Sequence, residues 1–335
     1  MNRTKLYLAL QGDKNPEEYI AFSKQAEEKG FDRIYVYDDL FYYPAYPILA
    51  TMAQHTKTIE LGACLLNGFY RHPAMIATNY AYLYQTIDTR AVMGLGRGAF
   101  FDLLNMETDE NHTRQGYEET AQMIHHFFKG EKEPFNGKIF KTNEKAFLKI
   151  PIPEKPHIVT ATWNRDMAYL AGKYSHELQI AEVWSDNYMS ELLEAFLKGN
   201  KENPLIENPK FSIGGMICIG NNEQEALMKA KSTVAIYLPY LQTILKSNGF
   251  DPESKVIQKI SHLSKTGKME EAAQCTPDEI AMALALVGTP EQISTKIKDI
   301  KGKFPIHGVL FSPPYGTGET IEDNINLLTN MAKQL

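Results

Sequence analysis

The chain has 335 residues, of which 43% are hydrophobic and 23% are charged, and its formal net charge is −6. This is the composition of an ordinary globular protein, and the length predicts two domains or one large α/β barrel. The acidic balance, without any run rich in Lys and Arg, argues against nucleic acid as the main partner.

Strand-like and helix-like patterns alternate along the chain. Short apolar runs predict strands, and apolar residues recurring every three to four positions predict helices. The predicted strands are 5–10, 33–39, 59–66, 91–98, 157–162, 178–184, 210–220 and 307–314. The predicted helices are 16–30, 46–56, 72–87, 119–130, 165–174, 287–303 with a cap at Thr289, and 320–335, together with a long helical region at about 222–285.

These eight apolar strands, separated by helices, predict a parallel sheet buried on both faces. Eight such units indicate a closed (β/α)8 TIM barrel, and an open doubly wound sheet is the alternative. We expect a single barrel domain over 1–335. The Pro-rich segment 134–156 is predicted to be an insertion lying across the main body, and the region at about 222–285 a helical insertion.

The cysteines and the chain's start bear on the compartment. Cys64, Cys218 and Cys275 are scattered and form no CxxC motif, so neither a disulfide framework nor a zinc site is predicted. A reducing, cytoplasmic compartment is expected. The apolar stretch before Gln11 is too short for a secretory leader, and no apolar run approaches the roughly 20 residues of a membrane span.

In a barrel of this kind the active site gathers at the C-terminal ends of the strands. The segments that follow the predicted strands are therefore the candidate site. They are Gln11-Gly12-Asp13, Asp38-Asp39, Leu66-Asn67, Gly96-Arg97-Gly98, Thr160-Ala161-Thr162-Trp163-Asn164, Glu182-Val183-Trp184 and Ser312-Pro313-Pro314-Tyr315-Gly316.

Asp38 and Asp39 end the second strand, and neighbouring strand residues point to opposite sides. One carboxylate could therefore face the barrel mouth while the other caps a loop or pairs with a base. The alternative is that both are solvated or capping groups.

The motif GLGRGA at 94–99 follows a strand, as a dinucleotide-binding loop does. No amphipathic helix starts at Arg97, and the segment before 119 looks irregular, so an NAD(P)-binding Rossmann domain is disfavoured. The glycines are better explained by close approach of a ligand to the backbone. Arg97 is expected to hold an anionic group or to pair with Asp102 or Glu107.

Asn164 stands where a helix N-cap belongs. The helix start there could bind a phosphate through its free N–H groups, or Asn164 could be an ordinary cap. His125 and His126 are adjacent in a helix and do not share a face, so no metal site is predicted. Cys64 is expected to be a small hydrophobic residue rather than a nucleophile, because nothing orients His72 as its base.

Five long motifs carry a resemblance to a known family. They are FDRIYVYDDLFYYPAYPILA, ELGACLLNGFYRHPAMIA, AVMGLGRGAF, VGTPEQI and HGVLFSPPYGTG. Over nearly its whole length the chain resembles the luciferase-like superfamily of flavin- and deazaflavin-dependent enzymes. The third and last motifs look most like the branch with methylenetetrahydromethanopterin reductase and F420-dependent alcohol dehydrogenase. The resemblance implies a luciferase-like barrel and an oxidoreductase that binds FMN or coenzyme F420.

The resemblance also implies roles for particular residues. Members of that branch have a bulge at the end of the third strand, with a non-prolyl cis peptide behind the cofactor's middle ring, and the matching bond is Cys64–Leu65. Asn67 would hydrogen-bond the ring or the substrate, and the cofactor's phosphate would lie near 162–164. The expected catalytic residues are Asp38, Asp39 and Asn67, and the expected cofactor-binding residues are Cys64, Leu65, Leu66, Asn67, Gly96, Arg97, Gly98, Thr160, Ala161, Thr162, Trp163 and Asn164.

The chain departs from the family's pattern at four places. Asp39 stands where the family often has His, Tyr43 where the alcohol dehydrogenase branch has Trp, and Ala99 where many members have Glu. Trp163-Asn164 replaces a common Gly-Pro. The usual proton-transfer residues are therefore partly missing, and Asp39 or Tyr43 is the hypothetical substitute.

The favoured function is a monooxygenase or a hydride-transferring reductase or dehydrogenase that acts on a small organic substrate. An FMN-dependent enzyme could need a separate flavin reductase as partner, and the family suggests a homodimer. The alternative is a non-catalytic flavin- or deazaflavin-binding protein on the same barrel.

Overall fold

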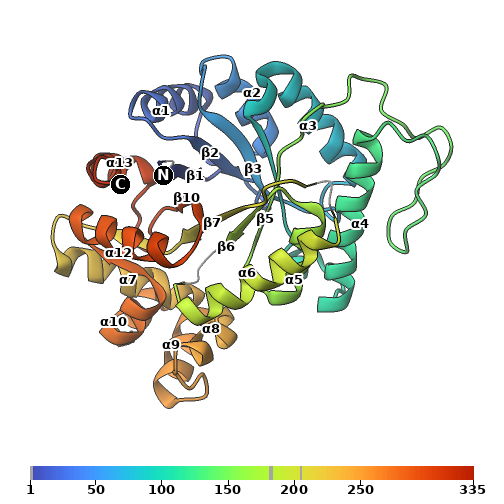
Figure 1. Ribbon diagram of the computed structural model, residues 1–335. Coiled ribbons are helices and arrows are strands. Elements are labelled where there is room, and N and C mark those ends of the chain that lie inside the picture. Colours follow the sequence, from blue (N-terminus) through green and yellow to red (C-terminus); the bar gives the residue numbers. More distant parts are fainter. Residues whose placement is uncertain (1–2, 181–183, 204–205) are drawn as a thin grey trace. The chain divides into compact units, whose positions relative to one another are not determined.

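A computed structural model of the chain describes residues 3–180, 184–203 and 206–335. Eight strands close a barrel in the order β1-β10-β7-β6-β5-β4-β3-β2, and the described strand pairs are parallel (Figure 1). The predicted TIM barrel is therefore confirmed. The barrel strands are β1 Lys5–Leu10, β2 Arg33–Tyr37, β3 Glu60–Leu66, β4 Ala91–Leu95, β5 Ile158–Thr162, β6 Glu177–Ile180, β7 Lys210–Gly215 and β10 Ile306–Phe311.

One predicted strand is two strands. The segment predicted as a single strand at 210–220 ends its barrel pairing at Gly215, whose φ of 114° favours glycine. The chain turns there, and β8 (Ile217–Ile219) pairs instead with β9 (Leu286–Gly288) in a separate two-stranded sheet. Of the strand predicted at 178–184, residues 181–183 lie outside the described part of the chain.

The helices follow local capping signals. Asn15, Thr289 and Thr320 form capping boxes, so the predicted cap at Thr289 is confirmed. The helices are α1 Pro16–Glu28, α2 Ala45–Ala53, α3 Pro73–Ile87, α4 Glu110–Phe128, α5 Arg165–Tyr174, α6 Asp186–Lys201, α7 Glu223–Tyr237, α8 Gln242–Ser247, α9 Lys255–Lys265, α10 Met269–Cys275, α11 Asp278–Leu284, α12 Pro290–Lys303 and α13 Ile321–Ala332. None in the described part of the chain is long and apolar enough to cross a membrane.

The helix predicted at 119–130 was placed too late. It starts at Glu110, because the Asp109 carboxylate caps it by accepting the His112 N–H at 2.7 Å. The first residues of α4 are polar and mostly exposed, so they carry no apolar periodicity. Helix α6 was not predicted.

The described residues form two compact units. Unit 1 comprises the described residues within 1–9, 180–194 and 211–335, and unit 2 comprises those within 10–179 and 195–210. Unit 1 contains α7–α11 in the predicted helical region, whereas the segment at 134–156 in unit 2 has only an isolated antiparallel bridge between Asn136 and Lys141. The single barrel domain with two insertions stays a prediction.

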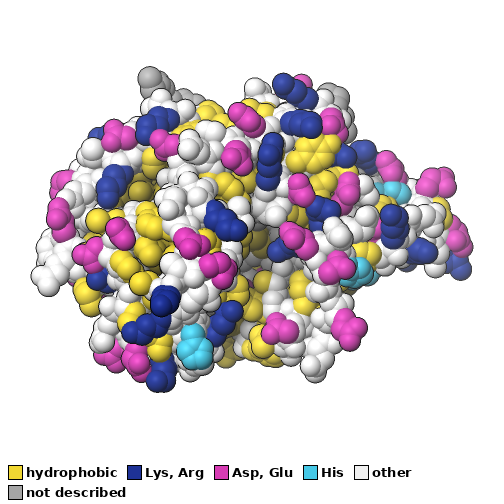
Figure 2. All heavy atoms as spheres, turned by 90° about the horizontal axis from the view of Figure 1, so that it is seen from below, with side chains coloured by type: hydrophobic (Ala, Val, Ile, Leu, Met, Phe, Trp, Pro, Cys, Tyr) yellow, Lys and Arg dark blue, Asp and Glu magenta, His cyan; other side chains and the backbone are white. Residues whose placement is uncertain are grey.

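Within unit 2, a buried ion cluster fixes the starts of the strands. Arg33 is fully buried and contacts Glu60 at 2.6 Å and Glu177 at 3.0 Å. A buried charge must be paired in this way, because removing it from water is costly. Figure 1 shows α3, α4 and α5 on the outside of the strands. The candidate residues follow the opposite, C-terminal ends of these strands. On the face drawn in Figure 2, acidic and basic side chains are interspersed.

Candidate active site

Asp38 is held by two contacts at the end of β2. Its carboxylate receives two hydrogen bonds from Arg71, at 2.6 and 2.9 Å, and accepts the Ala45 N–H at the start of α2 at 3.0 Å. A bidentate, charge-assisted pair of this kind is strong and geometrically specific. Asp38 is therefore the carboxylate that caps a loop and pairs with a base, one of the two roles that the sequence left open.

Asp39 is the carboxylate that stays accessible. It is exposed to solvent and accepts a hydrogen bond of 3.0 Å from the Gln11 amide, at the end of β1. Partial desolvation raises the pKa of Asp39, the Gln11 bond opposes this, and the neighbouring Asp38 charge adds to the rise. A carboxyl group with a raised pKa is suited to exchange protons with a ligand.

The peptide bond between Cys64 and Leu65 is cis, as the resemblance implies. The pairing of β3 with β4 shifts register between Ala63 and Leu66, so the strand bulges there. A Cβ added at Gly96 would lie 2.8 Å from a Leu65 side-chain atom, so this glycine allows the bulge to pack closely. Burial raises the pKa of the Cys64 thiol to about 12, which excludes a thiolate nucleophile at neutral pH.

Asn67 sits in a tight turn after β3. Its side chain accepts the N–H groups of Phe69 and Tyr70, both at 3.1 Å, and the residue is 5% exposed. Gly98 lies beside it, because a Cβ there would be 3.1 Å from the Asn67 Cγ. Tyr70 donates its hydroxyl proton to the Ala99 carbonyl, which ties the loop after β3 to the loop after β4.

Arg97 pairs with a residue other than the two expected. Its guanidinium contacts Glu110 at 3.0 Å, not Asp102 or Glu107. Glu110 was not considered as a partner because α4, which it begins, was predicted to start later. The same Glu110 oxygen accepts a hydrogen bond of 3.2 Å from the Asn164 amide. Arg97 therefore lies next to the first turn of α5.

Asn164 caps α5, as one of the two readings predicted. Its side chain accepts the Met167 N–H at 3.0 Å, and its own N–H donates to the Thr162 hydroxyl at 2.9 Å. Ala161 is half-buried, and Trp163 is 36% exposed. The start of α5 thus combines helix N–H groups, a hydroxyl and a nearby cation, which is a donor set suited to an anion.

Thr160 differs from its neighbours in the same segment. It is fully buried, and its hydroxyl lies 2.6 Å from that of Tyr117 and 2.7 Å from that of Ser175. Both contacts join β5 to its covering helices. Thr160 therefore supports the wall of the site rather than presenting a polar group to it.

The remaining candidate segments and the two adjacent histidines make other contacts. Within unit 1, the Tyr315 carbonyl accepts a hydrogen bond of 2.9 Å from Thr233, which ties the loop after β10 to α7. Glu182 and Val183 lie outside the described residues. His125 bonds the Tyr174 carbonyl and His126 pairs with Glu131, so both are structural. No group of three or more potential metal ligands occurs in the described parts of the chain.

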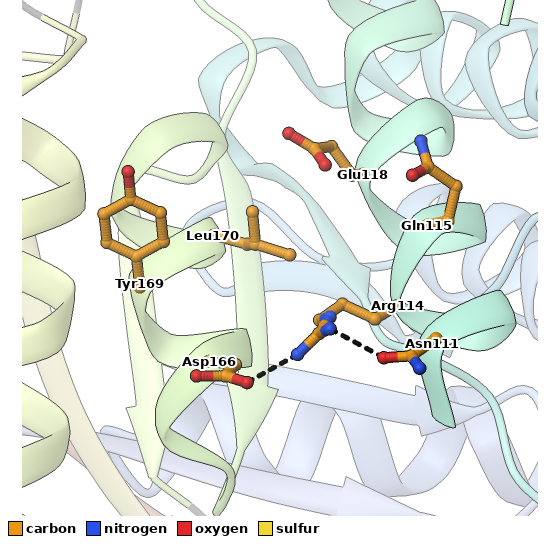
Figure 3. Close-up of a pocket in the computed structure, with 7 residues that line it drawn as sticks. All are labelled: Asn111, Arg114, Gln115, Glu118, Asp166, Tyr169 and Leu170. Atoms are coloured by element: carbon orange, nitrogen blue, oxygen red, sulfur yellow. Dashed lines mark hydrogen bonds and ion pairs between the residues drawn. The ribbon is translucent and has the colours of Figure 1, made fainter. Parts of the chain in front are cut away.

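A polar groove of about 470 Å³ runs between the outer faces of α4 and α5. In Figure 3 its only arginine, Arg114, is drawn between Asp166 at 2.5 Å and Asn111 at 2.8 Å. The lining residues are Asn111, Arg114, Gln115, Glu118, Asp166, Tyr169 and Leu170.

Sequence reasoning missed several residues that build the site. Arg71 and Tyr70 lie in a quoted motif but were given no role, and Glu110 was hidden by the late start assigned to α4. Glu119 was also missed; its buried carboxylate anchors the segment Lys138–Phe140. A capping Asp at position 109 was the one local signal that would have revealed Glu110.

Comparison with known proteins identifies the family. A family model described as luciferase-like monooxygenase matches residues 4–304. The chain belongs to the luciferase-like monooxygenase family. It is similar to 5,10-methylenetetrahydromethanopterin reductase of Methanolobus tindarius, with 24% identity over 294 residues that span 83% of this chain and 85% of that protein.

Two solved structures share the fold. The coenzyme F420-dependent tetrahydromethanopterin reductase of Methanopyrus kandleri matches with a TM-score of 0.83 and 21% identity, covering 98% of each chain. The oxygenating constituent of 3,6-diketocamphane monooxygenase from Pseudomonas putida, in complex with FMN, matches with a TM-score of 0.65 and 16% identity, covering 99% of this chain and 96% of that one. These two structures show the shared fold, whereas the family model and the reductase relative confirm the family resemblance and the oxidoreductase class.

Proposed function

We propose that this luciferase-like protein is a hydride-transferring oxidoreductase that uses coenzyme F420 and acts on a small organic substrate at the C-terminal ends of β2–β5. The grouping of donor side chains at the start of α5 is the observation that supports the proposal, because Glu110 contacts both Arg97 and the Asn164 cap there. The reductase relatives named above support F420 over FMN.

The residues present fit such a cofactor. Donors for its phosphate come from the first turn of α5, the Thr162 hydroxyl and Arg97. Arg97 would exchange its contact with Glu110 for one with the phosphate. The backbone of 64–66, with Gly96 and Gly98 packed against it, offers a wall for a planar ring. Asn67 orients its amide beside that wall. When bound, the cofactor supplies the hydride chemistry.

Asp39 is the residue we assign to proton transfer. Asp38 is unsuited, because both of its oxygens bond Arg71 and one also caps α2. Asp39 has a single neutral partner, Gln11, and its raised pKa allows it to hold a proton closer to neutral pH. It would donate a proton to the substrate oxygen or remove one from it, according to the direction of hydride transfer.

The test is a titration of the purified protein with F420 and, separately, with FMN, followed by fluorescence and thermal shift. Ligand that binds only the folded state raises the melting temperature as its concentration passes Kd. We expect saturable F420 binding that Asn67→Leu weakens. Thr78→Ala, an exchange of a helix residue on α3 away from the strand ends, serves as the control.

Other outcomes favour other functions. Binding of FMN alone would favour the monooxygenase, which the fold shared with the FMN-complexed structure also allows. Tight F420 binding without turnover by any alcohol or ketone would favour a non-catalytic binder. Binding of neither cofactor would refute the proposal.

The oligomeric state, compartment and partner protein are proposed together with this function. We infer a homodimer in the cytoplasm, with a separate flavin reductase as partner only in the FMN case. The three unpaired cysteines support a reducing compartment. Sedimentation analysis of the purified protein measures the oligomeric state directly.

A further inference from the structure

We propose that the substrate is largely apolar and carries no negative charge, and that two loops of unit 2 hold it. We call their exposed apolar side chains the apolar rim: Phe41, Tyr42, Tyr43, Phe100, Leu103 and Leu104. The inference rests on the proposed function only in placing the substrate at this end of the barrel.

The rim is a concentration of apolar surface in one place. It holds six of the seventeen exposed large hydrophobic side chains of the described residues, on the two short loops 38–44 and 96–104. These loops follow β2 and β4, which flank β3 in the parallel sheet. Since neighbouring strands lie about 4.8 Å apart, the loops start about 10 Å from each other, on either side of the 64–67 segment.

Two rim residues have backbone conformations that do not suit them. Phe41 has a φ of 67° and Phe100 a φ of 59°, in the left-handed region where bulky residues are uncommon. Their side chains are 78% and 59% exposed, so neither gains the stability of burial. An exposed aromatic residue in an unfavourable conformation adds nothing to folding, which points to a role in binding.

The rim is held in place by its surroundings. The Tyr43 N–H donates to the Gly12 carbonyl at 2.8 Å, and a Cβ at Gly12 would lie only 2.3 Å from the Tyr43 carbonyl oxygen. In the other loop, the Phe101 ring packs against those of Phe69 and Tyr70, at centroid distances of 5.4 and 5.3 Å. A preformed apolar surface loses little entropy when a ligand binds.

The ion pairs next to the rim argue against an anionic ligand. Arg71 is bonded to both oxygens of Asp38, and Arg97 is the cation assigned above to the cofactor. An anionic substrate would have to break the Arg71–Asp38 pair and leave a carboxylate that is only 6% exposed without its partner. An uncharged substrate carries no such cost.

The test measures binding of a graded ligand series by calorimetry, to the protein alone and with saturating F420 or FMN. The ligands are cyclohexanone and its 4-methyl, 4-ethyl and 4-propyl derivatives, with cyclohexanecarboxylate as the charged counterpart. We expect Kd to fall about four-fold for each added methylene, which corresponds to ~0.8 kcal/mol per buried group. The carboxylate should bind at least ten-fold more weakly than the ketone of similar size.

Phe41→Asn and Phe100→Asn remove the apolar side chains without straining the backbone, because Asn tolerates the left-handed region. We expect each to reduce the four-fold factor to two-fold or less while the melting temperature stays the same or rises. Met75→Gln, at a residue 56% exposed on α3, is the matched control and should keep the full factor.

The outcomes separate this inference from the proposed function. Affinity that grows with methylene number in the absence of any cofactor binding would support the apolar rim and refute the cofactor proposal. Cofactor binding with affinity independent of methylene number, or tighter binding of the carboxylate, would overturn the apolar rim. A dimer that dissociates in Phe100→Asn, without any methylene dependence, would show that the rim is a subunit contact and overturn it as well.

Discussion

The buried carboxylate of Glu119 is predicted to fasten the segment 134–156 to the barrel wall. It lies on α4, is 2% exposed, and accepts the backbone N–H groups of Lys138, Ile139 and Phe140 at 2.8 to 2.9 Å. Gln115 donates a fourth hydrogen bond at 2.9 Å. Burial raises the pKa of this carboxyl, but the three backbone bonds outweigh it, so the net pKa is lowered and the group stays ionised.

The perturbation is Glu119→Gln, which keeps the size and removes the charge. Each carboxylate oxygen accepts two bonds, and the amide nitrogen that replaces one oxygen would face two donors. Hydrogen bonds to charged groups contribute ~1.5–3 kcal/mol each, and a donor facing a donor adds the cost of an unsatisfied group. The segment can detach and hydrogen-bond to water, which limits that cost. We therefore expect the free energy of opening the segment to fall by about 2–3 kcal/mol.

The assay is trypsin cleavage at Lys138, Lys141 and Lys145 under conditions in which the rest of the protein stays folded. The cleavage rate follows the population of the open segment. That population rises ten-fold for each 1.4 kcal/mol by which the opening free energy falls. Glu119→Gln should therefore be cut about 30- to 150-fold faster than the wild type.

Glu118→Gln is the control. It lies on the same helix and contacts Tyr174 and Lys173 but not the anchored segment. Equal cleavage rates for Glu119→Gln, Glu118→Gln and the wild type would refute the anchoring argument.

Three further predictions concern residues near the strand ends and one surface carboxylate. Asp39→Asn should abolish turnover. Since the folded pKa of Asp39 is raised, its ionisation destabilises the fold, so the variant should be the more stable protein at pH 7 in denaturant titrations. The difference should shrink as the pH falls through the folded pKa and vanish below the ordinary Asp pKa. Glu27 accepts three backbone N–H groups and the Thr58 hydroxyl, which outweigh its burial and lower its pKa to about 2. Its stabilisation is present above the ordinary Glu pKa and is lost as the pH falls through about 2, so Glu27→Gln should unfold ~1–3 kcal/mol more easily at pH 7 and no more easily near pH 2. Gly12→Ala should push the Tyr43 backbone away, because its Cβ would lie 2.3 Å from that carbonyl oxygen, and should destabilise the protein by ~1–3 kcal/mol in chemical denaturation; a wild-type midpoint would contradict this.

Much of the fold was readable from the sequence because its signals are local. Each buried parallel strand is a short apolar run, and capping residues such as Thr289 mark helix starts within a few positions. The start of α4 was misplaced because its first turns face solvent and carry no apolar period. The departure of the chain at Gly215 was missed because the residues on both sides have the same apolar character.

The sequence by itself determined the barrel, the order of its elements and the strand ends that carry polar residues, because periodicity and capping depend on neighbours in the chain. Only the tertiary structure decided which charges pair. Asp38 and Asp39 are adjacent and chemically alike, yet one bonds Arg71 and the other Gln11, 33 and 28 positions away. The same holds for Glu119 and the segment it anchors. Such partners are chosen by the approach of strands and loops in space, and the energy of each contact depends on burial that no single stretch of sequence encodes.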